Sequence, residues 1–192
     1  MILLLPLVLA AGLLAAGCSD TESLLDGSDK PCGIDPGLYA NITGTADPVI
    51  MCVPDDRIEG TIDTGVHVDY SPQSGRYLIS AVYTEENTTH EIDLSFTAQR
   101  DVPAVLIATA NEAQAQLDSS FVWVFYQVTE QGGPTYTTTS ASGSITVSFN
   151  DPGILVATFG NIELRLTDDP GNPSSIVRAI TEGYLNLSTD SS

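Results

Sequence analysis

The sequence predicts an all-β domain, an antiparallel β-sandwich with a β-barrel as the alternative, that follows an apolar N-terminal segment and a flexible tether. Apolar and polar residues alternate with a period of two in many short runs, as they do in strands with one buried face. Clusters of Gly, Pro, Asn and Asp separate these runs at intervals of about ten residues, which is typical of sandwiches and barrels. Residues 109–117 are helix-permissive but lack an apolar stripe, so we expect one or two helical turns there at most.

The N-terminal segment has the layout of a signal peptide. Residues 2–16 are almost entirely apolar, small residues occupy positions 15–17, and polar residues begin directly after Cys18. Signal peptides carry an apolar stretch of about 7–15 residues before the small residues of the cleavage site, whereas a membrane-spanning helix takes about 20 apolar residues. We therefore predict a signal peptide over residues 1–17, with an uncleaved membrane span as the alternative.

The run Ala15, Ala16, Gly17, Cys18 resembles the lipoprotein box of bacterial lipoproteins. The resemblance implies that Cys18 is lipidated and becomes the new N-terminus, and that the protein is lipid-anchored in a bacterial cell envelope. Ser19, directly after the cysteine, is compatible with sorting to the outer membrane. One acyl chain binds a membrane only marginally, and the resemblance implies two or three chains on this cysteine. A secretory signal cut without lipidation is the alternative.

Cleavage before Cys18 would leave 192 − 17 = 175 residues, enough for one domain with a sizeable core. Residues 18–31 hold the lipidated cysteine and a polar stretch with little to bury, which we interpret as a flexible tether. Residues 32–56 are rich in Gly, Pro and Asp, and we interpret them as a loop region with one short strand near 49–53. The β domain is expected over residues 57–189.

Two cysteines remain after Cys18, namely Cys32 and Cys52. An even pair in an exported protein favours a disulfide. This bond would close a loop of about 20 residues and contribute roughly 3 kcal/mol of stability in the chain-entropy model. Two free thiols are the alternative. We therefore expect a disulfide that staples the loop region.

Strands of the β domain are expected where the alternation is clear or where a run is continuously apolar. The turn signals that separate them lie near residues 71–75, 85–87, 131–134, 150–153 and 168–173. The clearest expected strands are residues 76–83, 92–97, 102–109, 121–128, 145–149, 154–159, 162–167 and 176–187.

The last strands also carry three short patterns, each with a glycine. The residues are Gly143, Ile145 and Val147, then Thr158, Phe159 and Gly160, then Gly183, Tyr184 and Leu185. Together with the upstream strands, over about 110 residues, the layout resembles small secreted lipoproteins of bacteria, many from uncharacterised families. The resemblance implies a β fold and an envelope location. It implies no mechanism, because those families have no established activity.

Acidic residues outnumber basic ones by 25 to 6, for a net charge of −19. Such a surface repels phosphate backbones and anionic lipid, so we expect no nucleic-acid partner. The sequence contains no G-x-S-x-G elbow, phosphate loop or dinucleotide fingerprint. We therefore predict that the protein is not an enzyme and that it has no catalytic residues and no cofactor.

Both histidines have an acidic neighbour: His67 is two residues from Asp69, and His90 precedes Glu91. Such pairs can bind metals, but a site needs three converging ligands, so we expect both histidines to be surface strand residues. Oxygen-rich turns near residues 150–151 and 168–172 could bind Ca²⁺ but lack the spacing of an EF-hand loop. We expect no specific metal site.

Aromatic residues concentrate in one apolar run, where Trp123 and Phe125 share a face of the expected strand and Tyr126 takes the other. We interpret these rings as core residues, and the alternative is that a sugar-binding surface exposes them. Trp123 and Tyr136 are the candidate ligand-binding residues. Tyr136, in a Thr-rich stretch, is the better candidate for an exposed ring.

Together these observations predict a membrane-anchored bacterial lipoprotein with a non-enzymatic structural or binding β domain of unknown ligand. The alternative is a carbohydrate- or cell-wall-binding module that calcium could assist. The expected partner is the membrane, through the lipid on Cys18. An envelope glycan or protein is a candidate second partner.

Overall fold

The computed structural model describes residues 37–44, 47–54, 65–98, 102–151, 154–168 and 176–188, and for residues 150, 151 and 188 it describes the backbone alone. The chain divides into two units, Met1–Lys30 and Pro31–Ser192, and all described residues belong to the second unit. The predictions for the signal peptide, Cys18, the tether and Cys32 therefore lie outside the described residues. Among the described residues, no helix combines the length and apolar character that crossing a membrane requires.

Strands dominate the described part of the chain, so the predicted all-β class is confirmed. One short helix, α1 (Glu112–Leu117), lies where the sequence predicts one or two helical turns. The Asn111 side chain caps it by accepting a hydrogen bond from the Gln114 amide at 3.2 Å. The strands are β1 (Gly37–Gly44), β2 (Val49–Pro54), β3 (Gly65–Ser71), β4 (Arg76–Glu85), β5 (Thr88–Thr97), β6 (Ala104–Thr109), β7 (Phe121–Glu130), β8 (Thr135–Asp151), β9 (Ile154–Thr167) and β10 (Ile176–Ser188).

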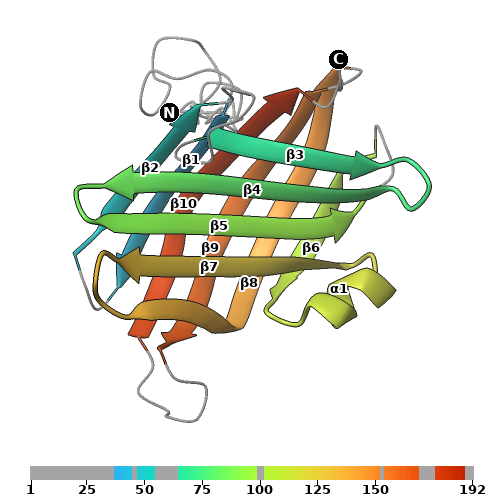
Figure 1. Cartoon of the computed structure of the whole chain (residues 1–192). Coiled ribbons are helices and arrows are strands. Elements are labelled where there is room, and N and C mark those ends of the chain that lie inside the picture. Colours follow the sequence, from blue (N-terminus) through green and yellow to red (C-terminus); the bar gives the residue numbers. More distant parts are fainter. Residues whose placement is uncertain are drawn as a thin grey trace, which may run out of the picture. The chain divides into compact units, whose positions relative to one another are not determined.

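These ten strands form one open sheet in the order β2-β1-β10-β9-β8-β6-β7-β5-β4-β3. Neighbouring strands are antiparallel except for β6 and β7, which pair in parallel over three residues. Figure 1 shows that the sheet forms two layers: β3, β4, β5 and β7 run across the front, and β1, β2, β8, β9 and β10 run steeply behind them. β8 links the layers, because its first residues pair with β7 and its later residues pair with β6 and β9.

The sheet extends into the segment that the sequence analysis interprets as a loop region. β2 confirms the short strand predicted near 49–53, but β1 was not predicted. β1 pairs with β2 on one side and with β10 on the other, and its alternate residues Leu38, Ala40 and Ile42 are fully buried. Cys52 lies on β2 with a half-buried side chain. Because Cys32 is outside the described residues, the disulfide between them stays a prediction.

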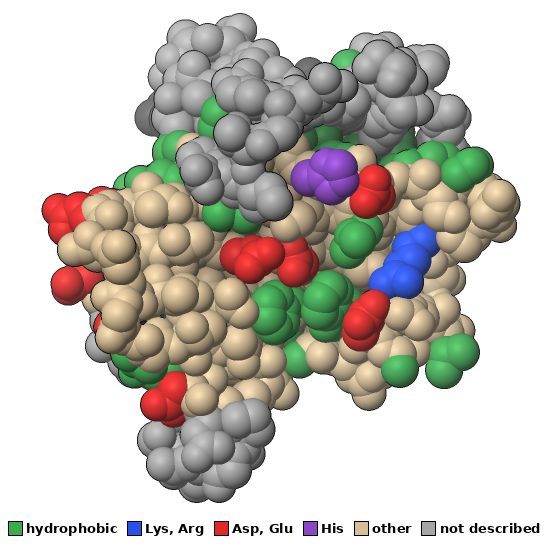
Figure 2. All heavy atoms as spheres, viewed as in Figure 1, with side chains coloured by type: hydrophobic (Ala, Val, Ile, Leu, Met, Phe, Trp, Pro, Cys, Tyr) green, Lys and Arg blue, Asp and Glu red, His purple; other side chains and the backbone are tan. Residues whose placement is uncertain are grey.

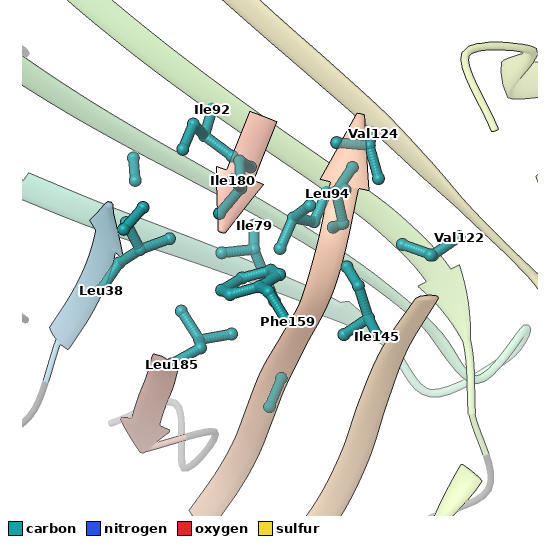
Figure 3. Packing of buried hydrophobic residues seen from close by; sticks show 14 of the residues in the cluster. Leu38, Ile79, Ile92, Leu94, Val122, Val124, Ile145, Phe159, Ile180 and Leu185 are labelled. Carbon is teal, nitrogen blue, oxygen red and sulfur yellow. The ribbon is translucent and has the colours of Figure 1, made fainter. Parts of the chain in front are cut away.

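A single hydrophobic core lies between the two layers. Figure 3 shows its side chains pointing toward one another from both layers. Full burial of one large apolar side chain stabilises a fold by about 1.5–3 kcal/mol, so this core accounts for most of the attraction between the layers. Its labelled members are Ile79, Ile92, Leu94, Val122 and Val124 from the front layer, and Leu38, Ile145, Phe159, Ile180 and Leu185 from the back layer.

β9 merges two predicted strands, 154–159 and 162–167, into one. Between them the register with β8 shifts: Ser144 pairs with Gly160, but Ser142 pairs with Glu163. This bulge adds one residue to β9 and resets its alternation, so that Phe159 and Ile162 are both buried although an even number of residues separates them. In the sequence alone, such a change of phase looks like the end of one strand and the start of another.

The core also contains a polar cluster around His90 on β5. Its Nδ1 atom lies 2.8 Å from the Tyr126 hydroxyl, and the two rings stack with centroids 6.1 Å apart. Arg178 of β10 is buried in the opposite layer and donates from Nη1 to the Asp47 carbonyl oxygen at 2.9 Å. Burial, and secondly the charge of Arg178, lower the pKa of His90 to about 4. Burial likewise raises the pKa of Tyr126 to about 12.

The expectation that His90 is a surface residue is therefore wrong: its exposed fraction is 3%. His90 shares the inward-pointing alternation of Ile92 and Leu94 on β5, and Glu91 points to the other face. His90 and Glu91, an imidazole and a carboxylate that could have contributed to a metal site, therefore lie on opposite faces of the sheet. For His67 the same expectation is confirmed, because 72% of its side chain is exposed.

We expect the free energy of unfolding to fall as the pH drops from about 6.5, the usual pKa of an unfolded histidine, to about 4. In this window the unfolded chain binds a proton at His90 that the folded chain does not. This difference lowers the free energy of unfolding by about 3 kcal/mol in total. His90→Gln has no group that titrates here and can still bond to Tyr126, so it should lack this share of the pH dependence. Denaturant unfolding at stepped pH measures it, and identical slopes for both proteins would contradict the assignment.

Candidate functional site

The candidate site lies on the face of the β3, β4, β5 and β7 layer that points away from the core, which we call the outer face. Strand register places its side chains in rows that run across the strands, with directly opposed side chains in contact distance. One row holds Asp69, Leu78, Ser95 and Trp123, and the next row holds His67, Ser80, Asp93 and Phe125.

A shallow groove of about 580 Å³ lies on the outer face. Figure 2 shows acidic (red) and hydrophobic (green) side chains next to one another in the middle of this face, with a basic side chain (blue) beside a further acidic one. Ligand sites commonly combine apolar or aromatic surface with a few polar groups, and the groove has both. Its charged and large aromatic lining residues include Asp69, Arg76, Glu91, Asp93, Glu112 and Trp123.

Two aromatic rings form the apolar part of the outer face. Trp123 and Phe125 stack with their centroids 5.6 Å apart and their planes inclined by 22°. Both side chains are half-buried, so the prediction that they fill the core is wrong for them, whereas Tyr126 on the opposite face is fully buried as predicted. Phe125 stacks on the indole, and Trp123 also lines the groove.

Arg76 ties the helix to one end of the groove. Its Nε atom donates to the hydroxyl of the buried Ser95 at 2.7 Å, and its Nη2 atom donates to Glu112 Oε1 at 2.9 Å. Glu112 is the first residue of α1, and its Oε1 atom also accepts from Gln116 Nε2 at 2.8 Å. The guanidinium therefore links β4, β5 and α1, and its charge is engaged by Glu112.

Two carboxylates of β5, Glu91 and Asp93, lie side by side on the outer face. Both are half-buried. Burial raises the pKa of Asp93, and a hydrogen bond from Ser80 partly offsets this effect. Burial, and secondly the charge of Asp93, raise the pKa of Glu91. The surroundings of both groups therefore disfavour their charged forms.

The structure separates the two candidate ligand-binding residues. Trp123 borders the groove, but Tyr136, on β8, is paired with the inward-pointing Val128 and packs against the core. Tyr136 is therefore half-buried on the inner side and is not the exposed ring that its Thr-rich surroundings indicated.

His67 and Asp69 form an exposed side-chain contact, with 3.2 Å between Nε2 and Oδ2. Within the described ranges, no three His, Cys, Asp or Glu side chains come together as a metal site would require. Of the oxygen-rich turns considered for calcium, Asp169 and Asn172 lie outside the described residues, as do the side chains of Asn150 and Asp151.

Arg76, Asp93 and Glu112 belong to the groove but were not among the sequence candidates. Asp93 could have been found, because it alternates with the buried Ile92 and Leu94 and so must face outward. Arg76 and Glu112 could not, since 36 residues separate them and the placement of α1 alone joins them.

Comparison with protein-family models, curated proteins and solved structures finds no match to this chain. The resemblance to bacterial lipoproteins therefore stays a prediction from the sequence.

We expect Arg76→Gln to lower the free energy of unfolding by about 1 kcal/mol and to speed amide hydrogen exchange in α1, because it removes a charged donor from buried Ser95 and the link to Glu112. Arg165→Gln is the matched control, since its contact with Glu163 is 3.8 Å long and exposed and should contribute almost nothing. Equal exchange in α1 of both variants would show that the link does not hold the helix.

Proposed function

We propose that this protein is a non-catalytic binding domain, lipid-anchored in a bacterial cell envelope, whose outer face binds carbohydrate. The half-buried Trp123 and Phe125 pair beside the groove is the observation that carries the proposal. Sugar rings have apolar C–H faces that pack on aromatic rings, and their hydroxyl groups donate hydrogen bonds to carboxylates. The groove offers both kinds of contact within neighbouring rows of the sheet.

We take the two crossing layers of the sheet to form an orthogonal β-sandwich. In a sandwich the inner faces pack in the core, which leaves the outer faces and the loops for ligand binding. The net charge of −19 supports a neutral or cationic ligand and disfavours an anionic one.

The anchor part of the proposal rests on the apolar leader and on Cys18. Two or more acyl chains on one cysteine hold a protein stably at a membrane, and the polar residues after Cys18 would separate the domain from the lipid surface.

We expect the native protein to partition into detergent and the peptide that begins at Cys18 to carry the mass of the acyl chains. A matched variant has an ordinary secretory leader in place of residues 1–17 together with Cys18→Ala, so that neither the leader nor the lipid remains. This variant should be released from membranes. An unmodified amino end or an intact leader in the native protein would refute the anchor.

We expect Trp123→Ala to weaken carbohydrate binding up to about tenfold, because the lost ring contact is worth up to about 1.5 kcal/mol. The probes are neutral hexasaccharides of glucose and of N-acetylglucosamine, with affinity measured by titration calorimetry. Ile50→Ala, which truncates an exposed apolar side chain on β2 in the other layer, is the control and should bind as the parent does. Binding that Trp123→Ala leaves intact would place the carbohydrate elsewhere.

A further inference from the structure

The charges on the outer face are unbalanced on one side of the groove. Among the described residues that line it, Arg76 carries the positive side chain, and its charge is engaged by Glu112 at 2.9 Å. Asp69 pairs with His67 at the outer edge. The described contacts of the groove thus leave Glu91 and Asp93, in the middle of the face, without a cationic partner.

Glu91 and Asp93 are also poorly solvated, since both are half-buried and burial raises the pKa of each. A partly desolvated carboxylate gains most from a charged donor, because hydrogen bonds between ionised groups are about twice as strong as neutral ones. A ligand with an ammonium group would therefore stabilise this pair more than a ligand with hydroxyl groups alone.

The aromatic rings and these carboxylates are close enough for one sugar ring to contact both. Asp93 is directly opposite Phe125 in the β5–β7 register, and Glu91 is opposite Gln127 in the next row. Directly opposed residues have Cβ atoms about 4.5–5.5 Å apart. A sugar that packs on the aromatic pair therefore has its substituents next to Asp93, where an ammonium also meets the electron-rich ring face.

We propose that the groove selects amino sugars with free ammonium groups, such as glucosamine oligomers, over their N-acetylated and neutral counterparts. The proposal rests on the carbohydrate-binding function proposed above and names the class of sugar. Complementary charge carries the selection: acetylation removes the positive charge that Glu91 and Asp93 bind, and adds bulk in its place. The acidic surface of the whole protein would further concentrate a cationic glycan near the groove.

The test compares the affinity of the full mature chain for a glucosamine hexasaccharide and for the N-acetylglucosamine hexasaccharide. We expect the amine form to bind about tenfold more tightly, and expect this advantage to shrink as salt rises from roughly 0.05 to 0.5 M. Asp93→Asn combined with Glu91→Gln should remove most of the advantage. The control for net charge is Glu163→Gln on β9, an exposed carboxylate in the other layer, and it should keep the preference.

The outcomes separate this inference from the function on which it rests. Equal affinity for both oligosaccharides, with Trp123→Ala weakening both, would overturn the amine preference and leave carbohydrate binding in place. Binding of neither would overturn both proposals. A lysine hexapeptide that binds as tightly as the glucosamine oligomer and is unaffected by Trp123→Ala would also overturn the inference, because the surface would then recognise charge without sugar.

Discussion

Burial of both inner faces of one continuous sheet in a single core is the constraint on which the other features depend. β8 passes from the front layer to the back layer, and the layers then enclose side chains from nearly every strand. Each large residue of this core, such as Leu94 or Phe159, contributes about 1.5–3 kcal/mol through burial. Because strand side chains alternate between the two faces, commitment of one set to the core places the other set on the outside.

β5 shows how the core determines the candidate site. His90, Ile92 and Leu94 point inward and are buried, and Glu91 and Asp93 therefore point outward beside the aromatic pair of β7. A slip of β5 by one residue would place both carboxylates in the core. The same hydrophobic contacts that stabilise the fold thus hold the acidic groups next to Phe125 and Trp123. The strands of this layer supply most of the groove's lining, and α1 supplies Glu112.

Polar groups inside the core impose a second condition on the same register. His90 and Tyr126 satisfy each other at 2.8 Å, and Arg178 comes from the opposite layer to the same region. Buried polar groups cost free energy when they lose their partners. Wrong registers between β5 and β7 are therefore penalised twice, once by buried carboxylates and once by an unpaired imidazole or hydroxyl group.

The sequence by itself determined the strand-rich class, the short helix and the acidic surface, because these depend on residue type and on spacing between near neighbours. It did not reveal β1, whose short alternation is surrounded by Gly and Pro, nor the bulge that joins two expected strands into β9. Only the tertiary structure decided which face of β7 is buried. Both faces of that strand are apolar, with Val122, Val124 and Tyr126 on one and Trp123 and Phe125 on the other, so periodicity alone cannot choose between them, and packing against the back layer does.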